Sequence, residues 1–265
     1  MKVGVVGCGN IGSALCQAVS RCDMPASIAA LTDIDIKRAE AIREMCCPHA
    51  RVCNLEQNAE VVDLLVECAC AAVVPDVVEM AISKKRQCLI MSVGGLLACP
   101  ELVDKARDAG YPVRVPSGAL CGLDGVRCAR EAGLEHVVLT TTKPPQGLEG
   151  APYIVENGIS LVDLTEPYIV FDGTAREACK AFPSNVNVAA ALSLAGIGPD
   201  RTRVRVVADP NAKSNRHEVF AEGAFGSLRA VTDNLPSPRN PKSSYLASLS
   251  AIAELRTAAE SFLGR

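Results

Sequence analysis

The sequence contains no tryptophan, and aromatic residues make up only 3% of its 265 positions. Platforms that stack nucleic-acid bases are built from aromatic rings, so this scarcity argues against a single-strand binder. A basic excess is missing as well, because the net charge is −3 and the pI is about 5.7. Non-specific nucleic-acid binders carry such an excess. We therefore expect no nucleic-acid partner.

Long apolar runs are also lacking. The most apolar region, residues 61–82, is interrupted by acidic residues such as Asp63 and Glu67 and by Pro75. It therefore does not predict a transmembrane helix. The chain opens directly on a strand-like K-V-G-V-V, which leaves no room for a signal peptide. We expect a soluble protein of the cytoplasm and no membrane partner.

Cysteine is abundant, with 13 residues, but paired C-x-x-C clusters are absent from the sequence. Most of the cysteines lie among Ala, Val and Leu, as small core residues do in a reducing compartment. The spacing predicts neither a zinc site nor any other metal site.

The first half of the chain alternates short apolar strands with helical patterns. Strands are predicted at 2–6, 28–32, 62–68, 88–92 and 112–116. Helices are predicted between them at 11–20, 36–45, 73–84 and 100–109. This alternation indicates βαβ units and a parallel sheet. We predict an α/β fold whose N-terminal domain, residues 1–120, is a doubly wound parallel sheet of the Rossmann type.

Beyond residue 119 the pattern changes. Residues 137–142, 201–208 and 217–223 suggest strands, and the last two alternate with period two, which is typical of half-exposed antiparallel strands. They predict a second α/β domain over 121–242 with a mixed or antiparallel sheet, which would bind substrate and support dimerisation. The P-S-P-R-N-P-K stretch predicts a structured loop or turn. The amphipathic helix at 243–264 is expected to pack back on the first domain.

A phosphate-binding turn is predicted where the first strand meets the first helix. Residues 7–12 read G-x-G-x-x-G, in the position of a dinucleotide-binding fingerprint. The glycines permit a tight turn, a close approach of pyrophosphate and close helix packing, while the helix N-terminus stabilises the phosphates. The candidate cofactor-binding residues here are Gly7, Gly9, Asn10, Ile11 and Gly12.

The second strand ends at Asp33, where a carboxylate can accept hydrogen bonds from the adenosine ribose. This favours NAD as the cofactor, with Asp35 as a competitor for the role. Lys37 and Arg38 follow and offer positive charge for a 2′-phosphate, so NADP stays open. Ser92, Val93 and Gly94 follow the strand at 88–92 and are expected near the nicotinamide, unless they form an ordinary loop.

Three histidines are present, at positions 49, 136 and 217. His49 lies in an early loop, and an edge role suffices for His136 before its strand. His217 lies in a dense polar segment, S-N-R-H-E, of the presumed substrate domain. A group that titrates near neutrality suits proton transfer, so His217 is the candidate acid or base.

Four stretches taken together resemble one family: P-S-G-A-L-C-G-L-D-G, T-T-K-P-P, F-P-S-N-V-N-V-A-A-A-L-S-L-A-G-I-G and N-R-H-E-V-F-A-E-G. Their order and spacing are similar to those of L-aspartate dehydrogenases of archaea and bacteria. The resemblance implies NAD(P)-dependent oxidation of L-aspartate to iminoaspartate, which yields oxaloacetate and ammonia or feeds NAD biosynthesis. It also implies a homodimer.

The resemblance assigns roles residue by residue. It implies that His217 is catalytic and that Asn187 contacts the nicotinamide side of the cofactor. It implies that Ala119 and Cys121 of one loop also bind the cofactor, and Cys121 lies where the family usually has a cofactor-contacting alanine. This chain also departs from the family at Thr142, where arginine is frequent, and at Cys70-Ala71, where a polar pair is frequent.

Aspartate has two carboxylates, so its pocket needs cationic and amide donors. The candidate substrate residues are Lys143, Asn185, Asn187 and Arg216. Either asparagine would serve equally well as a cap for the helix that follows. Arg201, Arg203 and Arg205 are spaced two apart and are expected on a solvated strand face.

Two other functions are compatible with the motifs. One is a two-domain reductase or dehydrogenase for another amino or keto acid, related to homoserine dehydrogenase or dihydrodipicolinate reductase. The other is a non-catalytic NAD(H) or redox sensor that uses the cysteines.

Overall fold

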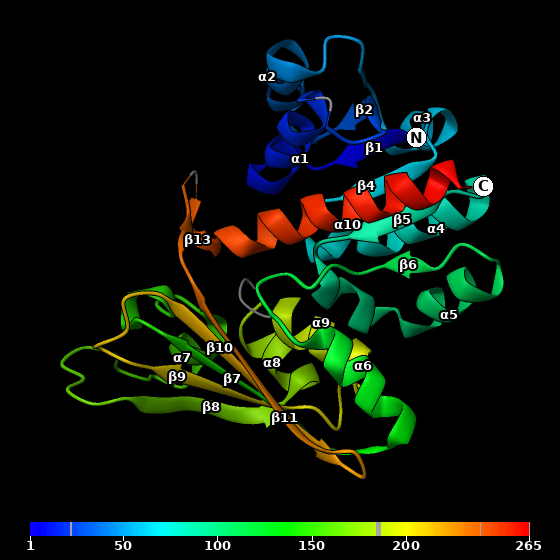
Figure 1. The fold of residues 1–265 in the computed structure, drawn as a ribbon. Helices are drawn as coiled ribbons and strands as arrows, with labels where there is room; N and C mark the ends of the chain where they lie inside the picture. Colours follow the sequence, from blue (N-terminus) through cyan, green and yellow to red (C-terminus); the bar gives the residue numbers. More distant parts are fainter. Residues whose placement is uncertain (22, 184–186, 239, 265) are drawn as a thin grey trace. The chain divides into compact units, whose positions relative to one another are not determined.

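A computed structural model describes residues 1–21, 23–183, 187–238 and 240–264. The chain divides into two compact units, Met1–Pro116 with Ser248–Arg265, and Ser117–Ala247. Each unit contains its own large sheet (Figure 1). The division after Pro116 falls slightly before the boundary that we expected near residue 120.

The first unit contains a six-stranded sheet in the order β3-β2-β1-β4-β5-β6, and all neighbours pair in parallel. The strands are β1 (Lys2–Val6), β2 (Ser27–Thr32), β3 (Arg51–Val52), β4 (Leu64–Glu67), β5 (Gln87–Ile90) and β6 (Val113–Arg114). The order reverses between β1 and β4, as in a doubly wound dinucleotide-binding sheet. The predicted Rossmann-type fold is confirmed.

Helices connect these strands (Figure 1). They are α1 (Asn10–Ser20), α2 (Ile36–Cys46), α3 (Leu55–Val61), α4 (Val74–Lys84) and α5 (Pro100–Asp108), with short 3-10 helices η1 (Ala71–Val73) and η2 (Val93–Ala98). Sequence analysis did not predict α3, a short helix with a capping box in which Asn54 and Gln57 bond reciprocally.

The C-terminal helix α10 (Tyr245–Leu263) belongs to the first unit from Ser248 onward. Its apolar residues Ala251, Leu255 and Ala258 lie in the same buried core as Val3 and Leu15. Burial of this face is the physical reason why the end of the chain joins the first domain.

The second unit contains a five-stranded sheet in the order β11-β10-β7-β9-β8. The strands are β7 (Leu134–Lys143), β8 (Tyr168–Thr174), β9 (Arg203–Ala208), β10 (Asn215–Gly223) and β11 (Gly226–Asn234). Only the β7–β9 pair is parallel. The predicted second, mixed sheet is confirmed, although β8 and β11 were not predicted as strands.

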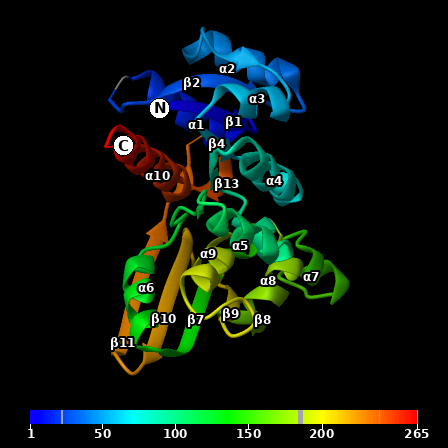
Figure 2. The same ribbon diagram turned by 90° about the vertical axis from the view of Figure 1, so that its right-hand side faces the viewer.

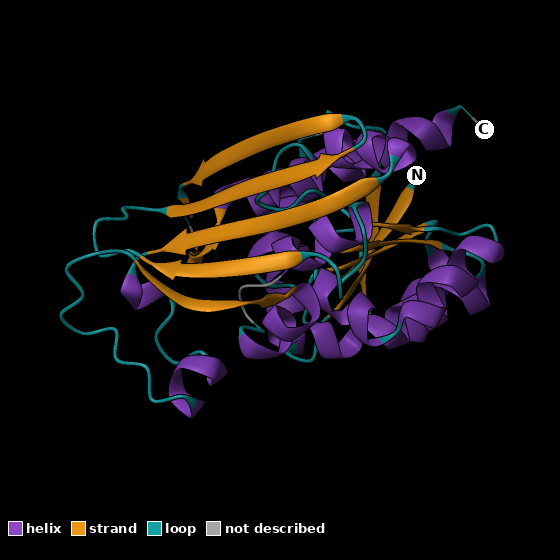
Figure 3. Cartoon of the chain, turned by 90° about the horizontal axis from the view of Figure 1, so that it is seen from below, coloured by secondary structure: helices purple, strands orange, loops and turns teal. Residues whose placement is uncertain are grey.

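Helices cover one face of this sheet (Figure 2). The helical segments are α6 (Leu123–Ala132), η3 (Pro145–Gly147), α7 (Pro152–Glu156), α8 (Ala175–Ala181) and α9 (Asn187–Ala195). Contacts to the strands come from α6 and α8, and α9 packs against both of these helices. Figure 3 looks onto the strands from below, with helices behind them. We call the helix-covered side the inner face and the opposite side the outer face.

Residues 236–242 correct one prediction. We expected a structured loop or turn, but β12 (Pro236–Ser237) pairs antiparallel with β13 (Asn240–Ser244). Proline cannot donate to a strand ladder and is confined to edge positions. A two-stranded ribbon has only edges, so it accommodates these prolines.

Within the described ranges, no helix is long and apolar enough to span a bilayer. The described side chains also form no group of three or more His, Cys, Asp or Glu that could hold a metal ion. The described cysteines are all free thiols.

Candidate active site

The glycine-rich turn between β1 and α1 is shaped for a ligand. Gly7 has φ +96°, and a Cβ there would lie 2.5 Å from the backbone nitrogen of Ala69. A Cβ at Gly9 would meet no protein atom within 4 Å. No side chain caps the N-terminus of α1. The turn therefore presents backbone and a helix N-terminus to open space, as phosphate binding requires.

A cavity of about 780 Å³ adjoins this turn. Its size is that of a small-molecule site. It lies at the carboxyl ends of β1, β2 and β4, beside the reversal of strand order, where doubly wound sheets bind nucleotides. Its lining includes Gly7, Gly9, Asp33, Arg38, Asn54 and Cys70.

The structure separates the two acidic candidates. Asp35 caps α2 by accepting hydrogen bonds from the backbone of Lys37 and Arg38. Asp33 lines the cavity and accepts hydrogen bonds from the backbone N–H of Cys8 at 2.6 Å and of Asp35 at 2.8 Å. Asp33 thus orders the glycine-rich turn and keeps lone pairs for further donors.

Ser92 has a structural partner that sequence analysis missed. Glu67, fully buried at the end of β4, accepts hydrogen bonds from the Ser92 backbone at 2.8 Å, the Ser92 hydroxyl at 2.8 Å and the Ala69 backbone at 2.7 Å. Burial raises the pKa of Glu67, and these bonds oppose the rise. Through these bonds the Glu67 carboxyl links the loop after β4 to the loop after β5. Val93 and Gly94 lie in the second of these loops, where they begin η2.

In the second unit, polar side chains gather at one end of the inner face. The register places His217 of β10 between Thr141 of β7 and Thr232 of β11. At the next inward-facing position, Asn215 of β10 pairs with Asn234 of β11. The next inward-facing residue of β7 after Thr141 is Lys143. On the other side of His217, the neighbouring inward-facing side chains are apolar: Leu139, Val219 and Ala230 lie in register on β7, β10 and β11.

His217 is buried, with 4% of its surface exposed. Its Nδ1 lies 3.1 Å from the Thr141 hydroxyl, which orients the ring. Desolvation, with a smaller contribution from the charge of Lys143, lowers the pKa of His217 to about 4. The imidazole is therefore neutral at neutral pH. His49 and His136 are exposed, so His217 is the one histidine in a shielded environment.

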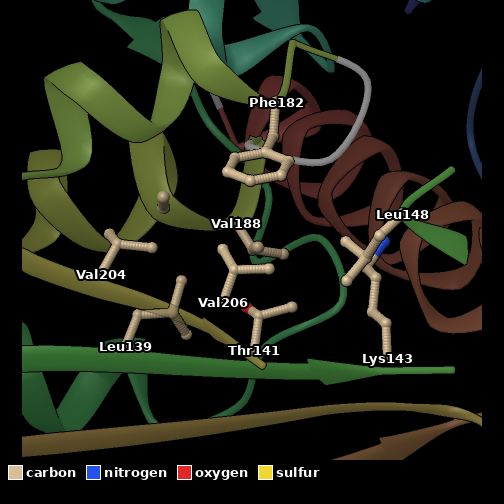
Figure 4. Close-up of a pocket in the computed structure, with 9 residues that line it drawn as sticks. Leu139, Thr141, Lys143, Leu148, Phe182, Val188, Val204 and Val206 are labelled. Carbon is tan, nitrogen blue, oxygen red and sulfur yellow. The ribbon is translucent and has the colours of Figure 1, made fainter. Parts of the chain in front are cut away.

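Lys143 ends β7 on the same face and is 5% exposed. Desolvation lowers its pKa to about 8. The cause is visible in Figure 4, where its side chain lies near Leu148 beside a small apolar cavity of about 10 Å³ that Phe182 and Val206 also line. A charged amine here is poorly hydrated and has much to gain from an anionic ligand.

A larger cavity, of about 630 Å³, opens beside Lys143. It lies between the loop after β7 and the start of β10. Its lining includes Lys143, Gln146, Glu149, Lys213, Ser214, Asn215 and Pro236. Amines, amides and a hydroxyl here are the donors that a dicarboxylate needs.

Arg216 requires a correction. Its side chain lies on the outer face, 47% exposed, and pairs with Asp233 at 3.0 Å. Alternation along β10 turns it away from His217 and Lys143, so it does not belong to their site. Thr142, the position at which the family frequently has arginine, pairs with Arg216 in register. Its side chain therefore lies on the outer face, opposite to that of Lys143.

The remaining candidates are distributed as follows. Asn185 lies outside the described residues, while Asn187 is exposed and begins α9. Ala119 and Cys121 belong to a loop held against β11, where the Cys121 thiol bonds to the Val231 carbonyl at 3.5 Å. Arg203 and Arg205 are exposed and share Asp172. Arg201 precedes the strand and bonds to the Leu134 carbonyl.

Comparison with known proteins decides the family. Residues 124–258 match the model described as "Aspartate dehydrogenase, C-terminal", and residues 7–116 match "Homoserine dehydrogenase, NAD binding domain". An L-aspartate dehydrogenase of Methanosarcina mazei is 45% identical over 262 residues, covering 97% of this chain and 96% of that protein. The chain belongs to the L-aspartate dehydrogenase family.

Further L-aspartate dehydrogenases agree with this assignment. That of Bradyrhizobium diazoefficiens is 40% identical over 97% of this chain and 91% of its own. The crystal structure of aspartate dehydrogenase from Thermotoga maritima superposes with a TM-score of 0.74 at 25% identity, covering 99% of this chain and 96% of that one. A myo-inositol dehydrogenase of Lactobacillus casei, solved with NAD(H), shares the fold with a TM-score of 0.55 at 15% identity.

Proposed function

We propose that this chain catalyses the NAD(P)-dependent oxidation of L-aspartate to iminoaspartate, which water converts to oxaloacetate and ammonia. The observation that carries the proposal is the shared burial of His217 and Lys143 on one sheet face. In a member of the L-aspartate dehydrogenase family, a neutral imidazole beside a desolvated amine fits proton transfer and carboxylate binding.

The residues of the first unit fit a nicotinamide dinucleotide. The open space at Gly9 and the uncapped α1 suit the pyrophosphate, and Asp33 suits the adenosine ribose. We propose that NAD is preferred and that NADP is also used, because Arg38 lines the same cavity as Asp33. The segment Ser92–Gly94, the loop with Ala119 and Cys121, and Asn187 would contact the nicotinamide half.

The side chains of the second unit would act on the substrate. Lys143 binds one carboxylate of aspartate through a charge-assisted hydrogen bond, with Asn215 as an amide donor in the same cavity. Neutral His217 takes the proton of the α-ammonium group, so that the nitrogen lone pair is available as hydride leaves Cα. A bound nicotinamide would supply the hydride acceptor. His217 passes that proton to solvent and, neutral again, takes a proton from the water that adds to the imine carbon.

Substrate charge would tune both groups. Desolvation by burial lowers the pKa of His217 to about 4 and that of Lys143 to about 8. A bound dicarboxylate adds negative charge beside them and raises both pKa values. Lys143 then stays charged, and His217 moves towards the neutral range in which a proton carrier works best.

The test is a spectrophotometric screen of amino acids with NAD and with NADP, following the reduced cofactor. We expect aspartate to be the best substrate, with a higher kcat/KM for NAD than for NADP. Turnover of homoserine or another amino acid in its place would contradict the proposal. Cofactor binding without any turnover would favour a sensor.

We also propose a cytoplasmic homodimer that supplies iminoaspartate to NAD biosynthesis, as the family resemblance implies. Apolar side chains on the strands are partly exposed, among them Tyr168, Ile169 and Val231. Burial of such residues against a second copy would be favourable. Sedimentation analysis of the full chain should give twice the 27.8 kDa of one protomer.

A further inference from the structure

Asn234, the last residue of β11, has a buried acceptor without a partner. It is 3% exposed and lies on the inner face, in register with Asn215 and one inward-facing position from Thr232, which pairs with His217. Among the described residues, nothing donates a hydrogen bond to its Oδ1 atom. A buried acceptor that has lost water and gained no donor is unfavourable, and such atoms are rare.

The surrounding bonds fix the orientation of this amide. Its Nδ2 donates to the Ala119 carbonyl at 3.1 Å and to the Thr232 hydroxyl at 3.2 Å. The Thr232 hydroxyl in turn donates to the same carbonyl at 2.9 Å. Because a carbonyl can only accept, turning the amide over would place two acceptors together. Oδ1 must therefore face away from Ala119.

The place of Asn234 indicates which donor would satisfy it. Its neighbours along the inner face are His217 and Asn215, which belong to the proposed substrate site. Its amide also holds the loop that contains Cys121, a candidate cofactor contact. The two reactants both carry N–H donors, the amino group of the substrate and the carboxamide of the nicotinamide.

We infer that Asn234 binds one of the two reactants: its Oδ1 accepts an N–H hydrogen bond from the substrate amine or from the nicotinamide carboxamide. The inference rests on the proposed function, since it assumes these two ligands. It makes Asn234 a specificity-determining residue for a nitrogen-bearing ligand, in addition to its role in holding the loop at Ala119.

Binding measurements on two variants separate these roles. Asn234→Leu removes the acceptor and the bonds to Ala119, whereas Thr232→Val weakens the hold on Ala119 and keeps the acceptor. Each variant is titrated calorimetrically with NADH and with the reduced 3-acetylpyridine analogue, which has a methyl ketone in place of the carboxamide. Each is then titrated, with NADH present, with aspartate and with succinate, which lacks the amine.

If the carboxamide is the donor, Asn234→Leu weakens NADH binding about tenfold and leaves the analogue within about twofold. If the amine is the donor, Asn234→Leu weakens the binding of aspartate about tenfold and leaves the binding of succinate within about twofold. Thr232→Val should show neither selectivity. Losses shared equally by both members of each pair, or matched by Thr232→Val, would overturn the inference. Because each comparison is made within one variant, it does not depend on how much of that variant folds.

Failure of the proposed function looks different. If wild type binds NADH but neither binds nor oxidises aspartate, the function is wrong, and the NADH and analogue titrations still decide the role of Asn234. An equal loss for both cofactors would then overturn it.

Discussion

The two faces of the second sheet differ in the environment of their ionisable side chains: the inner face buries them, and the outer face exposes them in ion pairs. His217 and Lys143 face inward, are almost fully buried, and have pKa values lowered by desolvation. Arg216, the neighbour of His217, faces outward and pairs with Asp233 in solvent. Arg203 and Arg205 likewise share Asp172 on the exposed side, where the pairing lowers the pKa of Asp172.

This difference underlies our proposal that the inward-facing charged residues are the functional ones. Exposed ion pairs cost little to form and contribute little to stability. Desolvation lowers the pKa of both His217 and Lys143, so a positive charge on either side chain is unfavourable inside the protein. The inner face is therefore where substitutions should change catalysis, and the outer face is where they should not.

The largest expected effect comes from adjacent positions on opposite faces. His217→Gln should lower kcat by about 10²–10⁴-fold, because proton transfer is lost, while NADH binding is kept. Arg216→Gln should leave kcat and KM within about twofold and change the free energy of unfolding by about 0.5 kcal/mol or less. Steady-state kinetics and NADH titration of the two variants check this. A similar loss of kcat in both would remove the distinction between the faces.

Lys143→Met should separate function from stability. The pKa of Lys143 lies below its value in an unfolded chain, so its charge opposes folding at every pH below about 8. We expect the free energy of unfolding at pH 7 to rise by about 1–3 kcal/mol. The KM for aspartate should rise by about 10–100-fold through loss of the charge-assisted bond. Denaturant melts and kinetics measure the two effects, and a destabilised variant would contradict the first.

The pH dependence of inhibitor binding gives a smaller effect. Succinate needs protonated Lys143, so above about pH 8 its inhibition constant should rise about tenfold per pH unit. Lys143→Arg serves as the control, because guanidinium stays charged and the break near pH 8 should vanish. A break that persists in the control would assign it to another group.

The smallest effect is expected at Arg203 and Arg205. Replacing either with Gln removes one partner of Asp172 on the exposed side of the sheet. We expect the KM for aspartate to stay within about twofold of wild type. A selective rise in KM would return these arginines to the substrate site and blur the contrast between the faces.

Local sequence patterns predicted much of the first unit and less of the second. The parallel strands of the first unit are buried on both faces, so their apolar runs are plain in the sequence. The strands β8 and β11 were not predicted. The β11 sequence is half exposed and rich in polar residues, so it looks like a loop. Without β11, Thr232 and Asn234 could not be placed beside His217. Thr141 and Asn215 were within reach, since each lies two positions from a predicted site residue on its strand.

By itself the sequence determined the nucleotide-binding turn, the acidic strand end and the candidate histidine, because each depends on residue type and short spacing. Only the tertiary structure decided that Asp35 caps a helix while Asp33 lines the cavity. It alone turned Arg216 outward and buried Lys143 beside His217. The physical reason is that strand pairing and helix packing, which join distant segments, determine which side chains lose water. Loss of water is what separates a reactive charged residue from a solvated one.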